Sequence, residues 1–211
     1  MKRTKRIIAL LLTLCTLIAL LLSFASCASA PRVEEIYDRV VELIDASYEI
    51  NTVFYGDGLP VWKTDSEFAE FSHLYFDFPY KGDYEQVKHQ SIFSSIEDIK
   101  SAAAGVYSLD YLETVLFPAA FDGLAVGDSV EGSRYLEEKG ILYQSTNDSF
   151  DIQGIPIYDY STMKVSPVGK RGVCIVEIEY FLDISPDLRQ TASLRLSLEE
   201  DGRWYLASFT G

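Results

Sequence analysis

A short run of polar side chains, Tyr158-Asp159-Tyr160, has the residue types best suited to acid–base chemistry in this chain. The run falls in an alternating, strand-like segment, so alternate residues would face the concave side of a curved sheet. An aspartate held among tyrosines in such a pocket would have a raised pKa and act as a general base. Alternatively, the two tyrosines pack in the core of the protein and the aspartate between them has no chemical role. The sequence therefore leaves both a candidate pocket at Tyr158, Asp159 and Tyr160 and ordinary strand packing open.

The remaining residues that could act as catalytic bases or metal ligands are not part of a recognisable catalytic or metal-binding motif. His73 and His89 have no metal-ligand spacing and no His-Glu-x-x-His motif, which favours surface histidines. Gly-x-Ser-x-Gly and glycine-rich phosphate loops are absent from the sequence. The acidic run at 147–151 lacks the glycine and distal glutamate of a calcium loop. We predict no catalytic residue, no metal and no cofactor, with an enzyme that uses Asp159 or a histidine as base as the alternative.

The first 27 residues have the order of an export signal. Four basic residues between positions 2 and 6 precede an apolar run at 7–22, and small residues then lead into Cys27. This order is typical of a secretory signal peptide. The apolar run is shorter than the roughly 20 residues that span a bilayer, and its extension through Ala25 would just reach that length.

Ser23-Phe24-Ala25-Ser26-Cys27 resembles the lipobox of bacterial lipoproteins, with Phe24 where that pattern prefers Leu. The resemblance implies a signal peptide at 1–26, lipid on Cys27, a tether at 27–32 and a membrane-anchored protein that faces outward. An uncleaved membrane helix and free secretion are the alternatives. Cleavage after residue 30 would leave Pro31 directly behind the cut, which disfavours free secretion. All three alternatives export the folded part.

The net charge limits which molecules this protein can bind, and the sequence around Cys174 indicates the state of its thiol. Four of the 18 basic residues lie in the head, so 14 basic and 32 acidic residues remain, a formal net charge of −18. Such a surface repels phosphate backbones and anionic lipids, which excludes nucleic acid and leaves the lipid on Cys27 as the membrane contact. We expect an envelope protein or a cell-wall glycan as partner. Cys174 stands alone in an apolar strand, which favours a buried inert thiol over a reactive one.

Helical periodicity dominates the first part of the folded region. Apolar residues at three- and four-residue steps predict an amphipathic helix over residues 33–54, with Glu34 and Glu35 in its first turn. Capping patterns predict shorter helices at 65–74, from Ser95 to near Gly105, and at 109–117, the last stopped by Pro118. Aromatic residues crowd positions 68–84, either as an exposed platform for sugars or a partner, or as core.

Alternation replaces helical periodicity after residue 134. A strand is also predicted at 84–90, and glycines between 123 and 132 predict an irregular connection. Hairpins are predicted at 134–144 around Lys139-Gly140 and at 155–182 around residues 169–171. Strands at 191–199 and 204–209 end the chain, and Cys174, Val176, Ile178, Tyr180 and Leu182 are predicted to face inward.

These elements predict an α+β fold in which N-terminal helices pack on one face of a curved antiparallel β-sheet, as a single domain at 33–211. The long first helix, the late meander and the terminal Gly202-Arg203-Trp204-Tyr205-Leu206 resemble the NTF2-like or cystatin-like group. The order of elements over 33–209 also resembles exported inhibitors of cell-separation DL-endopeptidases. The resemblance implies an extracytoplasmic, non-catalytic binding or inhibitory module that acts on wall-cutting peptidases.

Lipidation depends on one thiol, so it can be tested by one substitution. We expect Cys27→Ser to block acylation and processing, because the hydroxyl cannot replace the thiol that carries the lipid. Mass spectrometry of the membrane fraction should show the uncleaved chain of 23.8 kDa and no acyl group. Cys15→Ser is the control, since Cys15 lies within the signal. Unchanged acylation of the Cys27 variant would contradict the lipoprotein interpretation.

Overall fold

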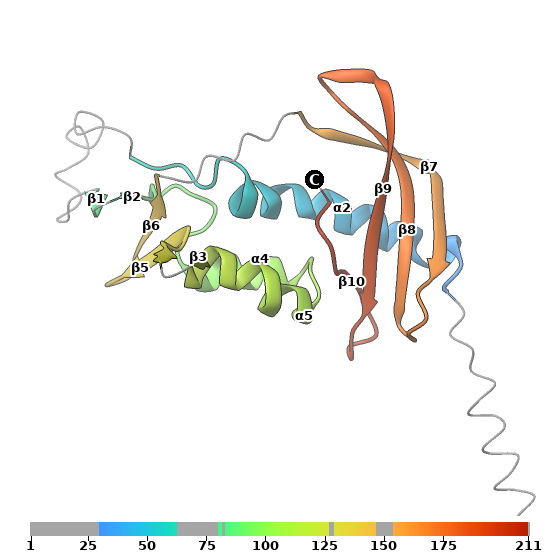
Figure 1. Ribbon diagram of the computed structural model, residues 1–211, viewed down its shortest axis with the longest axis horizontal. Coiled ribbons are helices and arrows are strands. Elements are labelled where there is room, and N and C mark those ends of the chain that lie inside the picture. The colour runs from blue at the N-terminus through green and yellow to red at the C-terminus, as the bar shows by residue number, and fades with distance from the viewer. Residues whose placement is uncertain (1–29, 63–79, 82, 127–128, 147–153, 211) are drawn as a thin grey trace, which may run out of the picture.

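The computed structural model describes residues 30–62, 80–81, 83–126, 129–146 and 154–210. Its longest helix is α2, which runs from Val33 to Tyr55 and confirms the helix predicted over 33–54 (Figure 1). The Glu35 carboxylate accepts a hydrogen bond from the Arg32 N–H at 3.1 Å and closes the first turn. At the other end, the Gly56 N–H donates to carbonyls of the last turn. The predicted helix at 65–74 and most of the aromatic cluster lie outside the described residues.

The shorter helices begin at the predicted capping residues, but the last of them continues beyond its predicted end. Ser95 accepts a hydrogen bond from the Asp98 N–H and starts α4, Ile96–Ala104, as predicted. Ser108 caps α5, Leu109–Tyr111, which continues as two segments of π-helical turns, η2 (Leu112–Leu116) and η3 (Pro118–Asp122). The predicted stop at Pro118 is wrong. Pro118 occupies the first position of η3, where a missing N–H leaves no hydrogen bond unmade.

The C-terminal sheet contains the hairpin predicted at 155–182. Its antiparallel strand order is β10-β9-β8-β7, and it includes β7 (Pro156–Pro167), β8 (Val173–Leu182), β9 (Ser185–Leu198) and β10 (Trp204–Leu206). Strand β9 begins six residues before the predicted start at residue 191. The reason is a tight turn at 183–184, where the Asp183 carboxylate accepts the Ile184 N–H at 2.8 Å and allows Leu182 to pair with Ser185.

The prediction of one curved sheet is only partly correct, because the described strands form separate antiparallel sheets. A second sheet has the order β1-β2-β6-β5 and consists of β1 (Tyr80–Lys81), β2 (Tyr84–Gln86), β6 (Ile141–Ser145) and β5 (Tyr135–Glu138). The β5–β6 hairpin turns at Lys139 and Gly140, both with positive φ, as predicted. Strand β6 of this hairpin pairs with β2 on its other side, and β5 forms one edge of the second sheet.

Two further details differ from the prediction around the second sheet. Residues 123–132, predicted as an irregular connection, include a short hairpin of β3 (Leu124–Val126) with β4 (Ser129–Glu131). The strand predicted at 84–90 is shorter, and only an isolated bridge at Val87 continues it beyond Gln86.

Helix α2 lies between the two four-stranded sheets and contacts both (Figure 1). Toward the C-terminal sheet, the Tyr48 hydroxyl donates to the Pro156 carbonyl of β7. Toward the second sheet, the Tyr135 hydroxyl and the buried Arg134 Nε each donate to the Val53 carbonyl at 2.8 Å. One hydrophobic core joins α2, α4 and both sheets. The fold is therefore α+β, with one helix as the common support.

The buried Tyr135 makes the stability of this arrangement depend on pH. Burial raises the pKa of Tyr135 to about 12, whereas an unfolded tyrosine ionises near pH ~10. The native state thus keeps a proton that the unfolded state loses, so this contribution is complete below pH ~10 and is lost as the pH rises toward about 12. We expect the melting temperature, followed by circular dichroism, to fall across this window. The fall should be shallower in Tyr135→Phe, and parallel curves for the two proteins would contradict the assignment.

Candidate functional site

A cavity of about 540 Å³ lies between the C-terminal half of α2 and the end of the C-terminal sheet where β8 turns into β9. Its walls come from four parts of the chain: α2, the start of β7, the facing ends of β8 and β9, and the last residues. The described lining residues are Tyr48, Asn51, Thr52, Gly154, Ile155, Pro156, Tyr180, Leu182, Gln190, Phe209 and Thr210. Most of the exposed wall is carbon, and a volume of this size is typical of small-molecule sites.

A buried hydrogen-bond network forms the base of the cavity. Asn51 Nδ2 donates to Thr210 Oγ1 at 2.7 Å, and Asn51 Oδ1 accepts from the Tyr107 hydroxyl. Thr210 Oγ1 also lies 2.6 Å from Ser47 Oγ, and the Thr210 carbonyl accepts from the Tyr158 hydroxyl. The network ties α2, the α4–α5 connection, β7 and the C-terminal segment together, so it holds Thr210 in the cavity wall.

Two tyrosines supply the polar groups of the side wall. The Tyr180 hydroxyl donates to Gln190 Oε1 at 3.0 Å, because the two residues are direct partners in the β8–β9 register. This bond leaves the two Nε2 hydrogens of Gln190 as donors. Across the cavity, burial and the negative charge of Asp45 raise the pKa of Tyr48. The Tyr48 hydroxyl therefore stays protonated at neutral pH.

The described lining contains no carboxylate, lysine, arginine, histidine or cysteine. Its ionisable groups are tyrosines, and burial also raises the pKa of Tyr158, which stands behind the wall. The described walls therefore carry no charge at neutral pH. Such a site can hold an apolar molecule and orient it by hydrogen bonds, but it offers no general base that would be ionised near pH 7.

The structure separates the three residues of the sequence-predicted pocket. The Tyr158 and Tyr160 side chains face α2, where Tyr160 donates to Asp45 Oδ1 at 3.2 Å. The carboxylate of Asp159, between them on β7, instead accepts the Ser161 hydroxyl at 2.6 Å and the Ser161 N–H at 3.2 Å. These bonds lower the pKa of Asp159. The predicted rise in its pKa is wrong, because strand alternation turns Asp159 away from the tyrosines and toward a hydrogen-bond donor.

The remaining candidates lie apart from this cavity. His89 sits exposed in the turn after β2 and is not in the lining. Cys174 is fully buried, and burial raises the pKa of its thiol to about 11, which confirms the prediction of a buried, unreactive cysteine. Cys27, His73 and the acidic run at 147–151 lie outside the described residues.

Neither a cluster of metal ligands nor a membrane-spanning helix is found in the described part of the chain. Three or more histidine, cysteine or carboxylate side chains do not gather there in a metal-binding geometry. The helices described there are each too short or too polar to cross a membrane.

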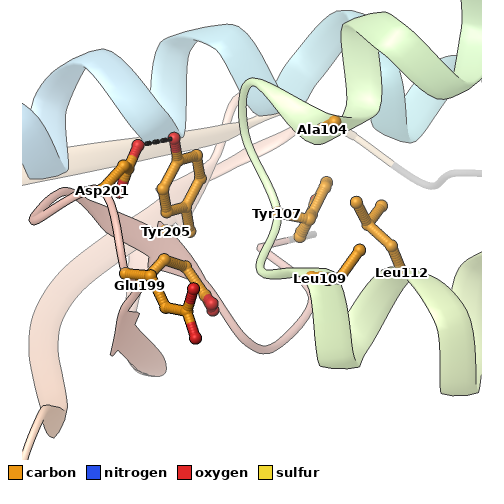
Figure 2. Close-up of a pocket in the computed structure, with 8 residues that line it drawn as sticks. Ala104, Tyr107, Leu109, Leu112, Glu199, Asp201 and Tyr205 are labelled. Atoms are coloured by element: carbon orange, nitrogen blue, oxygen red, sulfur yellow. Dashed lines mark hydrogen bonds between the residues drawn. The ribbon is translucent and has the colours of Figure 1, made fainter.

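A second, more open cavity of about 410 Å³ lies between α5 and the β9–β10 turn (Figure 2). Its apolar floor includes Tyr107, Leu112 and Leu109, which is 58% exposed. Three carboxylates of the β9–β10 turn stand at its rim: Glu199, Glu200 and Asp201. Sequence patterns marked residues 200–203 only as a turn, so this acidic rim was missed.

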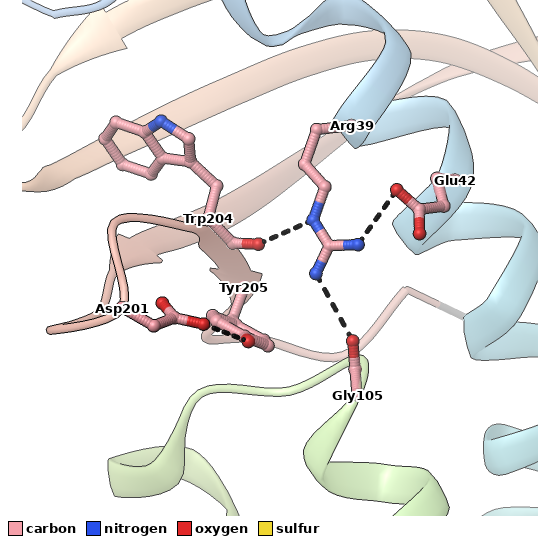
Figure 3. Close-up of polar contacts among 6 residues, drawn as sticks. All are labelled: Arg39, Glu42, Gly105, Asp201, Trp204 and Tyr205. Carbon is pink, nitrogen blue, oxygen red and sulfur yellow. Dashed lines mark hydrogen bonds and ion pairs between the residues drawn. The ribbon is translucent and has the colours of Figure 1, made fainter.

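Arg39 of α2 fixes the turn that carries the acidic rim (Figure 3). Its Nε donates to the Trp204 carbonyl at 2.9 Å, and its guanidinium lies 5.2 Å from the centre of the Tyr205 ring. The Tyr205 hydroxyl donates to Asp201 Oδ2 at 2.8 Å. Hydrogen bonds from the Arg203 N–H and from Tyr205 lower the pKa of Asp201, so this carboxylate of the rim is ionised at neutral pH.

Comparisons of this chain with protein-family models, with curated proteins and with solved structures find no match.

The buried network at the base of the larger cavity can be tested by removing its central amide. We expect Asn51→Leu to lower the free energy of unfolding by about 2–4 kcal/mol, because Tyr107 and Thr210 lose buried partners. Urea denaturation followed by circular dichroism measures the change. Glu49→Gln, an exposed substitution on the same helix, should change stability by less than about 0.5 kcal/mol. Equal stabilities of the two variants would contradict a structural role for the network.

Proposed function

We propose that this protein is a lipid-anchored, outward-facing and non-catalytic binding module of the cell envelope. The observation that carries this proposal is that the described lining of the larger cavity has no charged side chain. A hydrolase or isomerase that works near neutral pH needs a base or nucleophile beside its substrate. The described walls provide hydrogen bonds and apolar surface instead, which favours binding over turnover.

The anchor is the sequence-derived part of the proposal. A signal at 1–26 and lipid on Cys27 would leave a tether of residues 27–32 before α2. An extended tether of this length spans only about 20 Å, so the folded part would stay close to the membrane surface. Its net negative charge would keep it from lying flat on anionic lipids. The surface that meets partners would then face the wall.

The proposed fold relationship is to the NTF2-like or cystatin-like group. A long first helix packed on an antiparallel sheet with consecutive hairpins supports it. The second sheet is an addition that this relationship does not account for. The enzyme alternative that uses Asp159 loses support, because the pKa of that carboxyl is lowered and its side chain does not line the cavity.

The proposed partner is a wall-cutting peptidase with a basic surface. The resemblance to exported peptidase inhibitors suggests the class, and the rim at Glu199, Glu200 and Asp201 supports the charge. Beside this rim, the exposed Leu109 offers apolar contact. Opposite charges would speed association and set the orientation of the partner, while the apolar floor would slow its release.

The proposal predicts inhibition without turnover. We expect the full-length lipidated protein, in nanodiscs of zwitterionic lipid, to slow the release of wall fragments by a wall-peptidase fraction and to release none alone. Glu199→Gln with Glu200→Gln should weaken inhibition roughly tenfold at low salt. Glu177→Gln with Glu179→Gln is the matched control, since it removes the same charge from exposed positions on β8. An unchanged rate of release with the unsubstituted protein would contradict peptidase inhibition, and fragment release by the protein alone would contradict a non-catalytic role.

A further inference from the structure

We propose that the larger cavity binds an uncharged, mainly apolar molecule whose carbonyl or hydroxyl oxygen accepts a hydrogen bond from the Gln190 amide. The inference rests on the proposed binding function and adds the chemical class of the ligand. It follows from three properties of the described lining: its mainly apolar surface, the absence of charged side chains, and the Gln190 amide, whose oxygen is bonded to Tyr180 while its Nε2 hydrogens remain to be donated.

Apolar side chains provide most of the contact surface. Ile155 and Pro156 at the start of β7 and Leu182 at the end of β8 form one wall, and Phe209 of the C-terminal segment forms another. The Phe209 ring is held edge-on against Tyr55 with ring centres 4.7 Å apart. Contacts of this kind remove carbon surface of a ligand from water, which is the main source of affinity in small-molecule sites.

Charge excludes the ionised relatives of such a ligand. An anionic head group would lose its water in a cavity whose described lining has no cation. It would also approach a chain with a formal net charge of −14. A cationic head group would find no carboxylate in that lining. The carboxylate of Asp45 is not in the lining and accepts a hydrogen bond from Tyr160. A neutral head group avoids both costs.

Gln190 determines which neutral group fits. Its Oε1 accepts the Tyr180 hydroxyl at 3.0 Å, which orients the amide and leaves Nε2 as the donor. Among the described residues, none accepts a hydrogen bond from Nε2. Tyr180 and Tyr48 already donate their hydroxyl protons, so toward a ligand they can only accept. An oxygen acceptor of the ligand therefore pairs with Gln190, and a ligand hydroxyl can also donate to a tyrosine.

The entrance is apolar as well. Ile155 lines the cavity although it is 59% exposed, and the 64% exposed Ile184 lies at the adjacent β8–β9 turn. A Cβ on Gly154 would come within 2.9 Å of Ile184 Cγ1, so the two segments touch at this edge. An apolar ligand can thus pass from solvent or from a lipid phase over carbon surface into the cavity.

The test uses photoreactive dodecanol, dodecanoate and dodecylamine, which share one chain and differ in the charge of the head group. The full-length lipidated protein in nanodiscs is irradiated with each probe, and labelled peptides are identified by mass spectrometry. We expect dodecanol to label peptides around residues 154–156 and 180–190 at least about tenfold more than the charged probes do. Similar labelling by all three probes would overturn the assignment of a neutral ligand.

Substitutions at the cavity separate a specific site from general adsorption. Gln190→Leu should lower dodecanol labelling by about fivefold, the effect of one hydrogen bond. Gln190→Glu keeps the acceptor for Tyr180 and should shift the preference toward dodecylamine. Arg189→Leu is the matched control, because the Arg189 guanidinium lies over the Phe181 ring, 4.6 Å from its centre, and not in the cavity lining. Unchanged dodecanol labelling in both Gln190 variants would overturn the role of the amide.

Leu182→Trp distinguishes failure of this inference from failure of the proposed function. The larger side chain should fill the cavity and abolish labelling by dodecanol, while inhibition of wall-fragment release at the acidic rim should persist. Inhibition without specific dodecanol labelling of the unsubstituted protein would overturn the ligand class and leave the proposed function standing. Specific labelling without inhibition would remove the peptidase partner and leave the ligand site in place. Unchanged labelling in Leu182→Trp would place the bound probe elsewhere and overturn the assignment.

Discussion

The buried amide of Asn51 is the interaction on which the arrangement around the larger cavity depends. Its oxygen accepts from Tyr107 and its nitrogen donates to Thr210, so one side chain of α2 holds both the α4–α5 connection and the C-terminal segment. Polar groups buried at this depth cost free energy unless they are paired, and loss of one partner exposes the others to the same cost. Phe209 and Thr210 form part of the cavity wall because this network holds Thr210 in place. The cavity is thus a consequence of polar pairing, although its walls are mostly carbon.

Local structure could be predicted from the sequence where one period or one capping residue decides it. The helical period from residue 33 and the Ser95 cap led to α2 and α4, and Lys139-Gly140 marked the β5–β6 hairpin. Prediction failed where distant segments decide the outcome. Pairing of β2 with β6, which creates a second sheet, joins residues about 60 positions apart, and alternation carries no information on pairing partners. Pro118 was taken as a stop because the wide π-helical turns that accommodate it have no simple sequence signal.

The candidate site shows the same limit more sharply. The sequence grouped Tyr158, Asp159 and Tyr160 in one candidate pocket, whereas strand alternation places the Asp159 carboxylate on the opposite face from Tyr158, whose hydroxyl donates to the Thr210 carbonyl. Gln190 could not be found in this way. It becomes relevant only because the β8–β9 register sets it opposite Tyr180, and a tight turn at 183–184 fixes that register. Residues of a binding cavity are ordinary in sequence when their role comes from what lies across from them.

The two cavities differ in the charge of their described linings. Acidic side chains gather at the rim of the open cavity, whereas the described lining of the larger one has none. Tyr107 lies in the wall of the first cavity, and its hydroxyl is bonded to Asn51, which lies in the wall of the second. This hydrogen bond therefore links the walls of the two cavities directly. Asn51 uses its oxygen for Tyr107 and one hydrogen of its nitrogen for Thr210, and the residue is buried, so its amide serves mainly to support the C-terminal segment. The amide of Gln190 is less committed, because only its oxygen is bonded to Tyr180 and both Nε2 hydrogens remain for a ligand acceptor.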